Sequence, residues 1–232
     1  MPIEIGDLDL SFTNSALWMV ISVATASLFL ALGARRRALV PGRWQVMTEL
    51  AYEFVANMIR DNVGDAGRRY FPFIFTLFMF ILFGNLLGLI PGAFTFTSHI
   101  IVTLGMALTV FVAVTLIGIF KHGLHFFSFF VPSGVPALMM PLMIPIEIIS
   151  YLSRPVSLSI RLFANMMAGH TMMKVFAGFV VPLGAATLGI GGLAPIAMDV
   201  ALTGFELLVA FLQAYVFTVL TCLYLNDALH LH

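Results

Sequence analysis

The sequence contains little charge and almost no cysteine. Only 9% of its 232 residues are charged, whereas a soluble domain carries about 25%. Its 11 basic and 11 acidic residues cancel, so no excess of positive charge favours nucleic-acid binding. The single cysteine, Cys222, excludes a disulfide within the chain. The sequence also lacks a nucleotide-binding loop, a zinc-ligand pattern and a catalytic triad, so we expect no cofactor and no metal.

Apolar residues dominate what is present. They make up 61% of the chain, and the mean hydropathy is +1.06. A helix needs about 20 apolar residues to cross a bilayer, because it rises about 1.5 Å per residue. Uncharged runs of this length occupy residues 15–34, 71–90 and 100–120. We therefore expect an all-α polytopic membrane protein.

Two longer apolar segments, 137–181 and 196–226, occupy the second half of the chain. The first is at least twice the length of a perpendicular span, and it contains three prolines but no polar turn. One steeply tilted or bent helix fits this pattern better than two crossings. Because the glycine-rich residues 184–195 supply a turn, the two segments should form a long tilted hairpin. The prediction is therefore five membrane-crossing helices.

Residues 43–63 predict a different kind of helix. Apolar residues recur there at helical spacing, while Glu49, Glu53 and Arg60 lie on another face. The pattern is typical of an amphipathic helix that lies at the membrane interface or packs on neighbouring helices. Together with the five spans, this helix completes a single membrane domain over residues 1–232.

Basic residues are confined to one side of the predicted spans. All basic residues from Arg35 to Lys121 fall at the same ends of the first three spans. Because cytoplasmic loops are enriched in arginine and lysine, we expect the N-terminus outside and the C-terminus in the cytoplasm. Glu4, Asp7 and Asp9 precede the first span, where a signal peptide would be basic, so we expect no cleavable signal.

Arg161 is the most unusual residue of the long segments. Its guanidinium cannot lose its charge, and an ionisable residue within a membrane costs roughly 3 kcal/mol on the insertion scale. At about 100° per residue, one polar stripe of this helix contains Glu147, Ser150, Arg154, Ser157, Arg161 and Asn165. In the last helix Asp199, Glu206 and Gln213 recur every seven residues and share a face. The stripe and this face predict a polar contact between the two helices.

The hairpin should bring these polar faces together. Residues equally far from the glycine-rich turn should face each other. The turn is too irregular to fix the register, but the order of the residues allows His170 to lie level with Glu206 and Arg161 to lie near Gln213. His170 and Glu206 can exchange protons through water on the outer side of Arg161. Glu147 lies about 21 Å away on the inner side, by helical rise. Two such half-pathways need a mobile carboxylate to carry the ion from one to the other.

The motifs resemble those of subunit a of F-type ATP synthases. Residues 154–157 read Arg-Pro-Val-Ser, and residues 161–170 read Arg-Leu-Phe-Ala-Asn-Met-Met-Ala-Gly-His. Residues 212–220 resemble the last helix of that family, and residues 85–91 resemble its first core span. The resemblance covers nearly the whole chain and is greatest to the alphaproteobacterial and mitochondrial branch.

The resemblance implies a role for each polar residue. Arg161 would face the ring of c subunits and keep their carboxylates ionised, with Gln213 as its neighbour. The outer half-channel would be lined by Glu206, His170, Asn165 and Asn85. The cytoplasmic half-channel would be lined by Glu147, Ser150 and Ser157. The sequence departs from many members at Gly88, where they carry an aspartate.

The resemblance also implies a setting. The chain would be a non-catalytic, proton-translocating subunit of an ATP synthase in a bacterial inner membrane. Its partners would be the c-subunit ring, the b-type subunits of the peripheral stalk and membrane lipid. Two alternatives remain: an anion channel or carboxylate transporter in which Arg161 binds the substrate, and a structural subunit in which Arg161 pairs with a partner's acid.

Simpler interpretations remain for individual residues. Asn85 and Asn165 could join helices by hydrogen bonds alone. Ser150 and Ser157 could donate back to carbonyl groups of their own helix. Arg154 is expected to extend to the cytoplasmic surface rather than to conduct ions. The sequence assigns no role to Lys174, His99 or Asp199.

Overall fold

The protein was studied as a computed structural model that describes residues 4–5, 8–9, 13–35, 42–90, 92–123, 126, 139–187 and 189–230. The helices of this part are α1 (Asn14–Ala34), α2 (Arg43–Val63), α3 (Phe71–Gly88), α4 (Ile100–His122), α5 (Met140–Ala186) and α6 (Leu193–Leu229). Short 3₁₀ turns occupy Asp65–Tyr70, Phe96–Ser98 and Ile190–Gly192. Two short antiparallel strands, β1 (Glu4–Ile5) and β2 (Leu8–Asp9), precede α1.

Five of these helices are long and apolar enough to cross a membrane, namely α1, α3, α4, α5 and α6. The prediction of an all-α fold with five spans is therefore confirmed. Their outward side chains are apolar and exposed: Ile101, Phe120 and Val200 are 76%, 85% and 69% exposed. Exposing so much apolar surface to water would be unfavourable, whereas contact with lipid tails is not.

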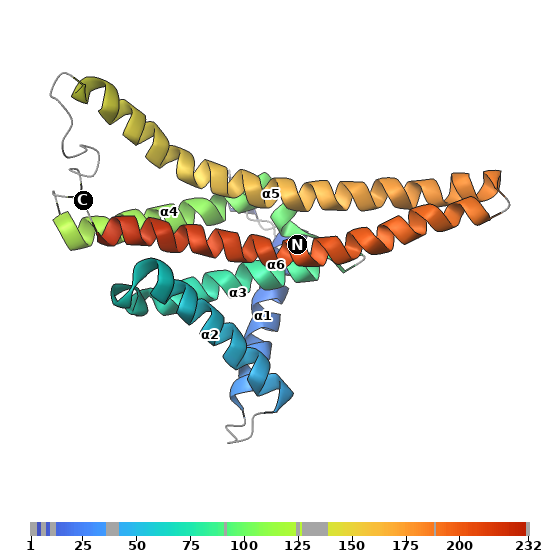
Figure 1. Cartoon of the computed structure of the whole chain (residues 1–232), viewed down its shortest axis with the longest axis horizontal. Helices are drawn as coiled ribbons and strands as arrows, with labels where there is room; N and C mark the ends of the chain where they lie inside the picture. The colour runs from blue at the N-terminus through green and yellow to red at the C-terminus, as the bar shows by residue number, and fades with distance from the viewer. Residues whose placement is uncertain are drawn as a thin grey trace.

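The hairpin of α5 and α6 is the longest feature of the molecule (Figure 1). α6 packs against α5 and also against α2, α3 and α4. α1 and α2 project to one side, and the far end of the hairpin extends beyond the other helices (Figure 1). The N-terminal half of α5, which contains Pro145 and Pro155, diverges from α6 (Figure 1). Prolines within a helix remove a hydrogen bond and bend it.

The turn of the hairpin is shorter than the glycine-rich composition of residues 184–195 predicted. α5 continues through Pro182 to Ala186, and α6 begins at Leu193. Gly189 has a φ of 94°, a conformation that glycine adopts without strain. The Thr187 hydroxyl donates to the Leu183 carbonyl and accepts from the Gly191 N–H, each at 2.6 Å. The turn therefore centres on Gly189, and both helices extend beyond the predicted segments 137–181 and 196–226.

A core of apolar side chains forms where α2, α3 and α6 meet. Val55, Ile74 and Phe217 are fully buried in it. The ring of Phe54 on α2 lies 5.6 Å from that of Phe78 on α3 and 5.7 Å from that of Phe211 on α6. The apolar side of α2 thus packs on the other helices, which is one of the two roles that its amphipathic pattern allowed.

An ion pair joins α5 to α6 at the end where α6 terminates. Arg154 Nη1 donates to Asp227 Oδ2 at 2.9 Å, and the guanidinium lies 5.4 Å from the ring centre of Tyr151 and 5.0 Å from that of Tyr224. The Tyr151 hydroxyl is 2.7 Å from the Thr115 hydroxyl on α4. Arg154 therefore binds neighbouring helices through a partly exposed ion pair, a contact that the sequence did not predict.

Candidate functional site

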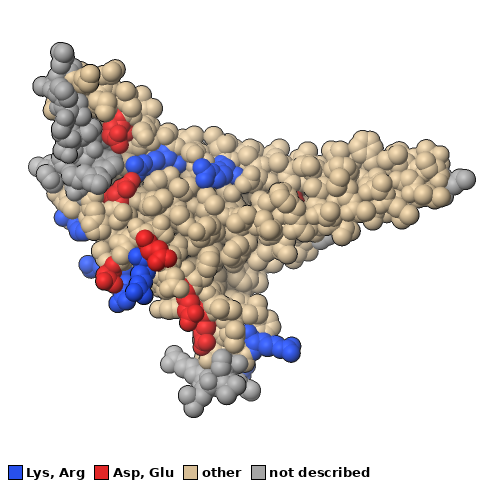
Figure 2. Space-filling view, in the orientation of Figure 1, with Lys and Arg blue, Asp and Glu red and all other residues tan. Residues whose placement is uncertain are grey.

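Polar side chains meet at one place between α5, α6 and the end of α3, where three of them are buried, His170 is half-buried and Asn165 is exposed. We call this set the polar seam: Asn85, Asn165, His170, Glu206 and Gln213. In Figure 2 the visible charges gather over α2 and over the end of the molecule that carries the C-terminus, whereas the far part of the hairpin shows almost none. The seam is therefore a partly buried polar contact between helices whose outer surface is mostly apolar.

A hydrogen bond between amides fixes the middle of the seam. Asn165 Nδ2 donates to Gln213 Oε1 at 2.8 Å, and Gln213 is only 4% exposed. Gln213 Nε2 is buried and has no hydrogen-bond partner among the described residues. Asn165 lies one helical turn from Arg161 on α5. The hydrogen-bond partner of Gln213 in the described part of the chain is therefore Asn165.

Glu206 is a buried carboxylate without a protein partner. It is 6% exposed, and neither of its oxygens has a hydrogen bond within the described part of the chain. It lies against Gly169, where an added Cβ would collide with Glu206 Oε1. A buried carboxyl group without a hydrogen bond costs several kcal/mol unless water or a proton satisfies it. The sequence did not single out Gly169, because the need for space appears only once α6 is in place.

His170 follows Gly169 and binds a different element. Its Nε2 lies 2.8 Å from the hydroxyl of Thr95, which precedes α4, and that hydroxyl donates to the Gly88 carbonyl at 2.9 Å. The structure thus brings His170 and Glu206 to the same level of the hairpin, as expected, without a hydrogen bond between them. Thr95 was missed, because no spacing in the sequence relates it to α5.

Asn85 connects α3 to the seam. It is fully buried, and its Nδ2 donates to the Ala210 carbonyl at 3.3 Å, one turn of α6 from Glu206. This bond is the helix-joining contact that the simpler interpretation allowed. Its Oδ1, however, is buried and unpartnered among the described residues. Unsatisfied buried polar atoms are rare in native proteins and indicate missing water or a functional role.

Arg161 lies outside the seam on an exposed face of α5. Among the residues that the structure describes, no side chain forms a hydrogen bond or ion pair with its guanidinium, although Tyr224 lies within electrostatic range. A charge on the apolar outside of a membrane helix needs a partner acid or water. Within the described ranges, the charge of Arg161 is therefore left without a stabilising partner.

The residues expected on the inner side do not meet α6. Ser150 and Ser157 are exposed on α5, and Glu147 is half-buried. Neither serine hydroxyl has a partner in the described ranges; the back-bonding serines of this helix are Ser153 and Ser159. The inner set therefore lies on the same open surface as Arg161.

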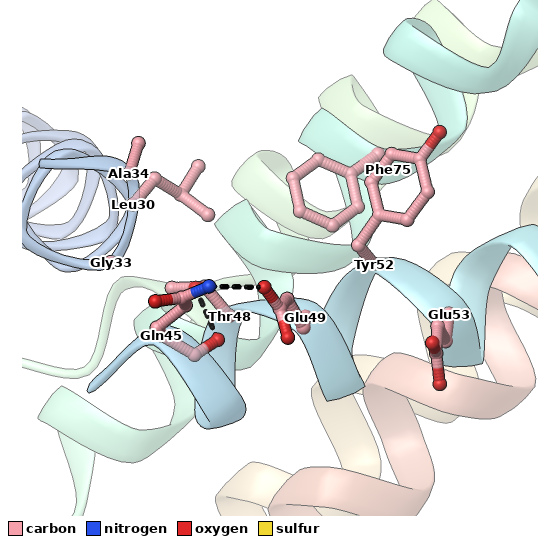
Figure 3. A pocket seen from close by; sticks show the side chains of 9 residues that line it. All are labelled: Leu30, Gly33, Ala34, Gln45, Thr48, Glu49, Tyr52, Glu53 and Phe75. Atoms are coloured by element: carbon pink, nitrogen blue, oxygen red, sulfur yellow. Dashed lines mark hydrogen bonds between the residues drawn. The ribbon is translucent and has the colours of Figure 1, made fainter. Parts of the chain in front are cut away.

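A pocket also lies elsewhere, between α1, α2 and α3. It has a volume of about 670 Å³, and Gln45, Glu49 and Tyr52 line it beside apolar residues (Figure 3). Glu49 accepts a hydrogen bond from Gln45 on the same helix at 2.8 Å. Because its polar groups are exposed or satisfied within α2, this pocket is a weaker candidate site than the seam.

The fold and the seam define a class: a multi-pass helical membrane protein with buried polar groups between its long helices and an arginine that no described residue pairs. Residues 16–226 match the family model described as ATP synthase A chain. Similar proteins named ATP synthase subunit a are those of Chelativorans sp. and Mesorhizobium japonicum, each 62% identical, and of Pelagibacter ubique, 60% identical. The matches cover 99% of this chain and 93%, 92% and 93% of those proteins.

The chain belongs to the ATP synthase A chain family. The resemblance seen in the sequence, including the alphaproteobacterial branch, is confirmed. This membership favours a subunit of an ATP synthase over an independent anion transporter.

Gly169 provides a test of the geometry. Gly169→Ala should lower ATP synthesis by membrane vesicles several-fold, because the new methyl group displaces the Glu206 carboxylate. Gly178→Ala on the same helix is the matched control, since a Cβ there meets nothing within 4 Å. Both rates are normalised to the amount of assembled complex. Equal rates for the two variants would contradict the described packing of Glu206.

Proposed function

We propose that this chain is the proton-conducting stator subunit of an F-type ATP synthase. It assembles with the other subunits, passing protons to and from the carboxylates of a rotating c-subunit ring while b-type subunits of the peripheral stalk hold it still. The chain is not itself catalytic. Two half-channels that do not meet, one on each side of Arg161, carry the protons.

The observation that carries this proposal is the unpaired guanidinium of Arg161. A c-subunit carboxylate that passes within about 4–6 Å would be held ionised by this charge. A second positive charge, such as a proton in transit, is repelled by it. Arg161 thus releases the proton of the arriving carboxylate and blocks direct leakage between the half-channels. The direction of rotation then follows from the proton gradient.

The outer half-channel runs through the polar seam. Four of its buried polar atoms have no hydrogen-bond partner among the described residues: both oxygens of Glu206, Oδ1 of Asn85 and Nε2 of Gln213. Buried polar groups of this kind bind ordered water in proteins. A chain of water molecules along these atoms would carry protons between His170, Glu206 and the ring. Asn165 and Gln213, bonded to each other, end this path one turn from Arg161.

The cytoplasmic half-channel follows the open face of α5. Glu147, Ser150 and Ser157 lie on the inner side of Arg161 and leave their side chains free for water or for the ring. In this arrangement α5 itself forms one wall and the c-ring forms the other. The half-channel is complete only in the assembled enzyme.

The setting of the chain is a bacterial inner membrane, with the N-terminus in the periplasm and the C-terminus in the cytoplasm. The one-sided distribution of basic residues supports this orientation.

In a variant without Cys222, a cysteine at the exposed Arg68 should react with an impermeant thiol reagent only from the cytoplasm. A cysteine at Ile190, which is 75% exposed, should react only from outside. Reaction of both from one side would refute the orientation.

Substitution of Arg161 tests the mechanism. Arg161→Ala should abolish ATP-driven proton pumping by the reconstituted complex, because the ring carboxylates would no longer be held ionised. Arg161→Lys keeps a charge but loses the planar, multi-donor head, so we expect it to fail nearly as badly. Lys174→Ala, at an exposed position on the same helix, is the control and should pump normally. Near-normal coupling in assembled Arg161→Ala complexes would favour the purely structural role.

A further inference from the structure

Thr95 links the end of α3 to the histidine of the seam. It is 7% exposed, its hydroxyl donates to the Gly88 carbonyl at 2.9 Å, and the same oxygen lies 2.8 Å from His170 Nε2. Gly88 is the last residue of α3, so its carbonyl has no partner within the helix. No backbone N–H in the described part of the chain donates to it. The Thr95 hydroxyl is therefore the group that satisfies this buried carbonyl.

The chemistry of a hydroxyl then determines the state of the histidine. A threonine hydroxyl has one proton to donate and two lone pairs to accept with. Because its proton is directed to Gly88, it can only accept from His170, and Nε2 must carry a hydrogen. In a neutral imidazole one nitrogen is protonated and the other is free to accept. The free nitrogen of His170 is thus Nδ1, to which no described residue hydrogen-bonds.

The position of Thr95 is held by its surroundings. The next residue, Phe96, is 1% exposed, stacks on Phe80 with ring centres 5.5 Å apart and fits against Gly84, where any Cβ would collide with its ring. The Ser98 hydroxyl donates to the Thr95 carbonyl at 2.7 Å. A group fixed in this way can orient another side chain without reorganising itself.

We propose that Thr95 is a positioning residue of the outer half-channel, whose hydroxyl, anchored on the Gly88 carbonyl, accepts from Nε2–H of His170 and leaves Nδ1 to take up and release the travelling proton. This role rests on the proposed function, to which it adds Thr95 and the Nε2-protonated tautomer of His170. A proton that arrives through water binds Nδ1 to give the imidazolium. It leaves again from Nδ1, and the Nε2–H···O bond persists throughout.

Three variants of the whole complex, pumping protons in reconstituted vesicles, test this role. Thr95→Val keeps the shape but removes the hydroxyl, and we expect its ATP-driven pumping to fall roughly tenfold, the lower range for loss of a partner that orients a histidine. Thr95→Ser keeps the hydroxyl and should pump near the unmodified rate. Thr103→Val is the matched control: Thr103 is fully buried, but its hydroxyl bonds only to the Ile100 carbonyl of its own helix. All rates are normalised to assembled complex.

Coupling between the two residues separates this proposal from the proposed function. Thr95→Val should cause no further loss in a His170→Gln background, because the hydroxyl acts through the ring. Unreduced pumping by Thr95→Val, or equal losses for Thr95→Val and Thr95→Ser, would overturn the role of the hydroxyl while leaving the half-channel intact. Unreduced pumping by His170→Gln itself would instead remove His170 from the proposed pathway.

Discussion

Arg161 carries a charge that it cannot lose and that no residue in the described part of the chain neutralises. Removing a guanidinium from water without a partner is unfavourable, so the residue is tolerated only where an acid or water reaches it. This constraint therefore favours contact between the open face of α5 and a partner that supplies an acid or water. Together with family membership, this constraint explains why the chain acts as part of a complex and not as an independent transporter.

A second constraint operates at the polar seam between α5 and α6. There the polar atoms are buried and unsatisfied, which in a membrane favours a line of water between helices. Small residues make room for the polar side chains: Gly169 lies against the Glu206 carboxylate, and Gly88 lies against Thr95. The ion pair between Arg154 and Asp227 fixes the two long helices at one end, and the Gly189 turn fixes them at the other. These two contacts therefore hold α5 and α6 in one register along the seam.

The spans and the polar residues were predictable because each depends on a local pattern. Length and hydropathy determine a membrane helix, and helical periodicity placed Asn165 and Arg161 on one stripe. The register between α5 and α6 was harder to predict from the sequence. The glycine-rich stretch was too irregular to fix it, and only the structure shows that the turn centres on Gly189 and brings Gln213 to Asn165.

Contacts that depend on tertiary packing were not predictable from the sequence. Thr95 lies far from His170 along the chain, and no periodicity connects a loop residue with a helix. Gly169 matters only because a side chain of α6 fills the space above it. The partner of Arg154 was missed because Asp227 follows a long apolar run near the end of the chain, where an interaction with solvent was equally compatible with the sequence.

The most direct test of the central claim is a disulfide scan between α5 and a cysteine placed beside the carboxylate of the c subunit. Cysteines at Ser157, Ala164 and Ala168, which share the helical face of Arg161, should cross-link to the ring in native membranes. Cysteines at the equally exposed Val156, Ile160 and Met167, about 100–140° around the helix, should not. Cross-linking confined to the second set would contradict the claim that Arg161 faces the ring.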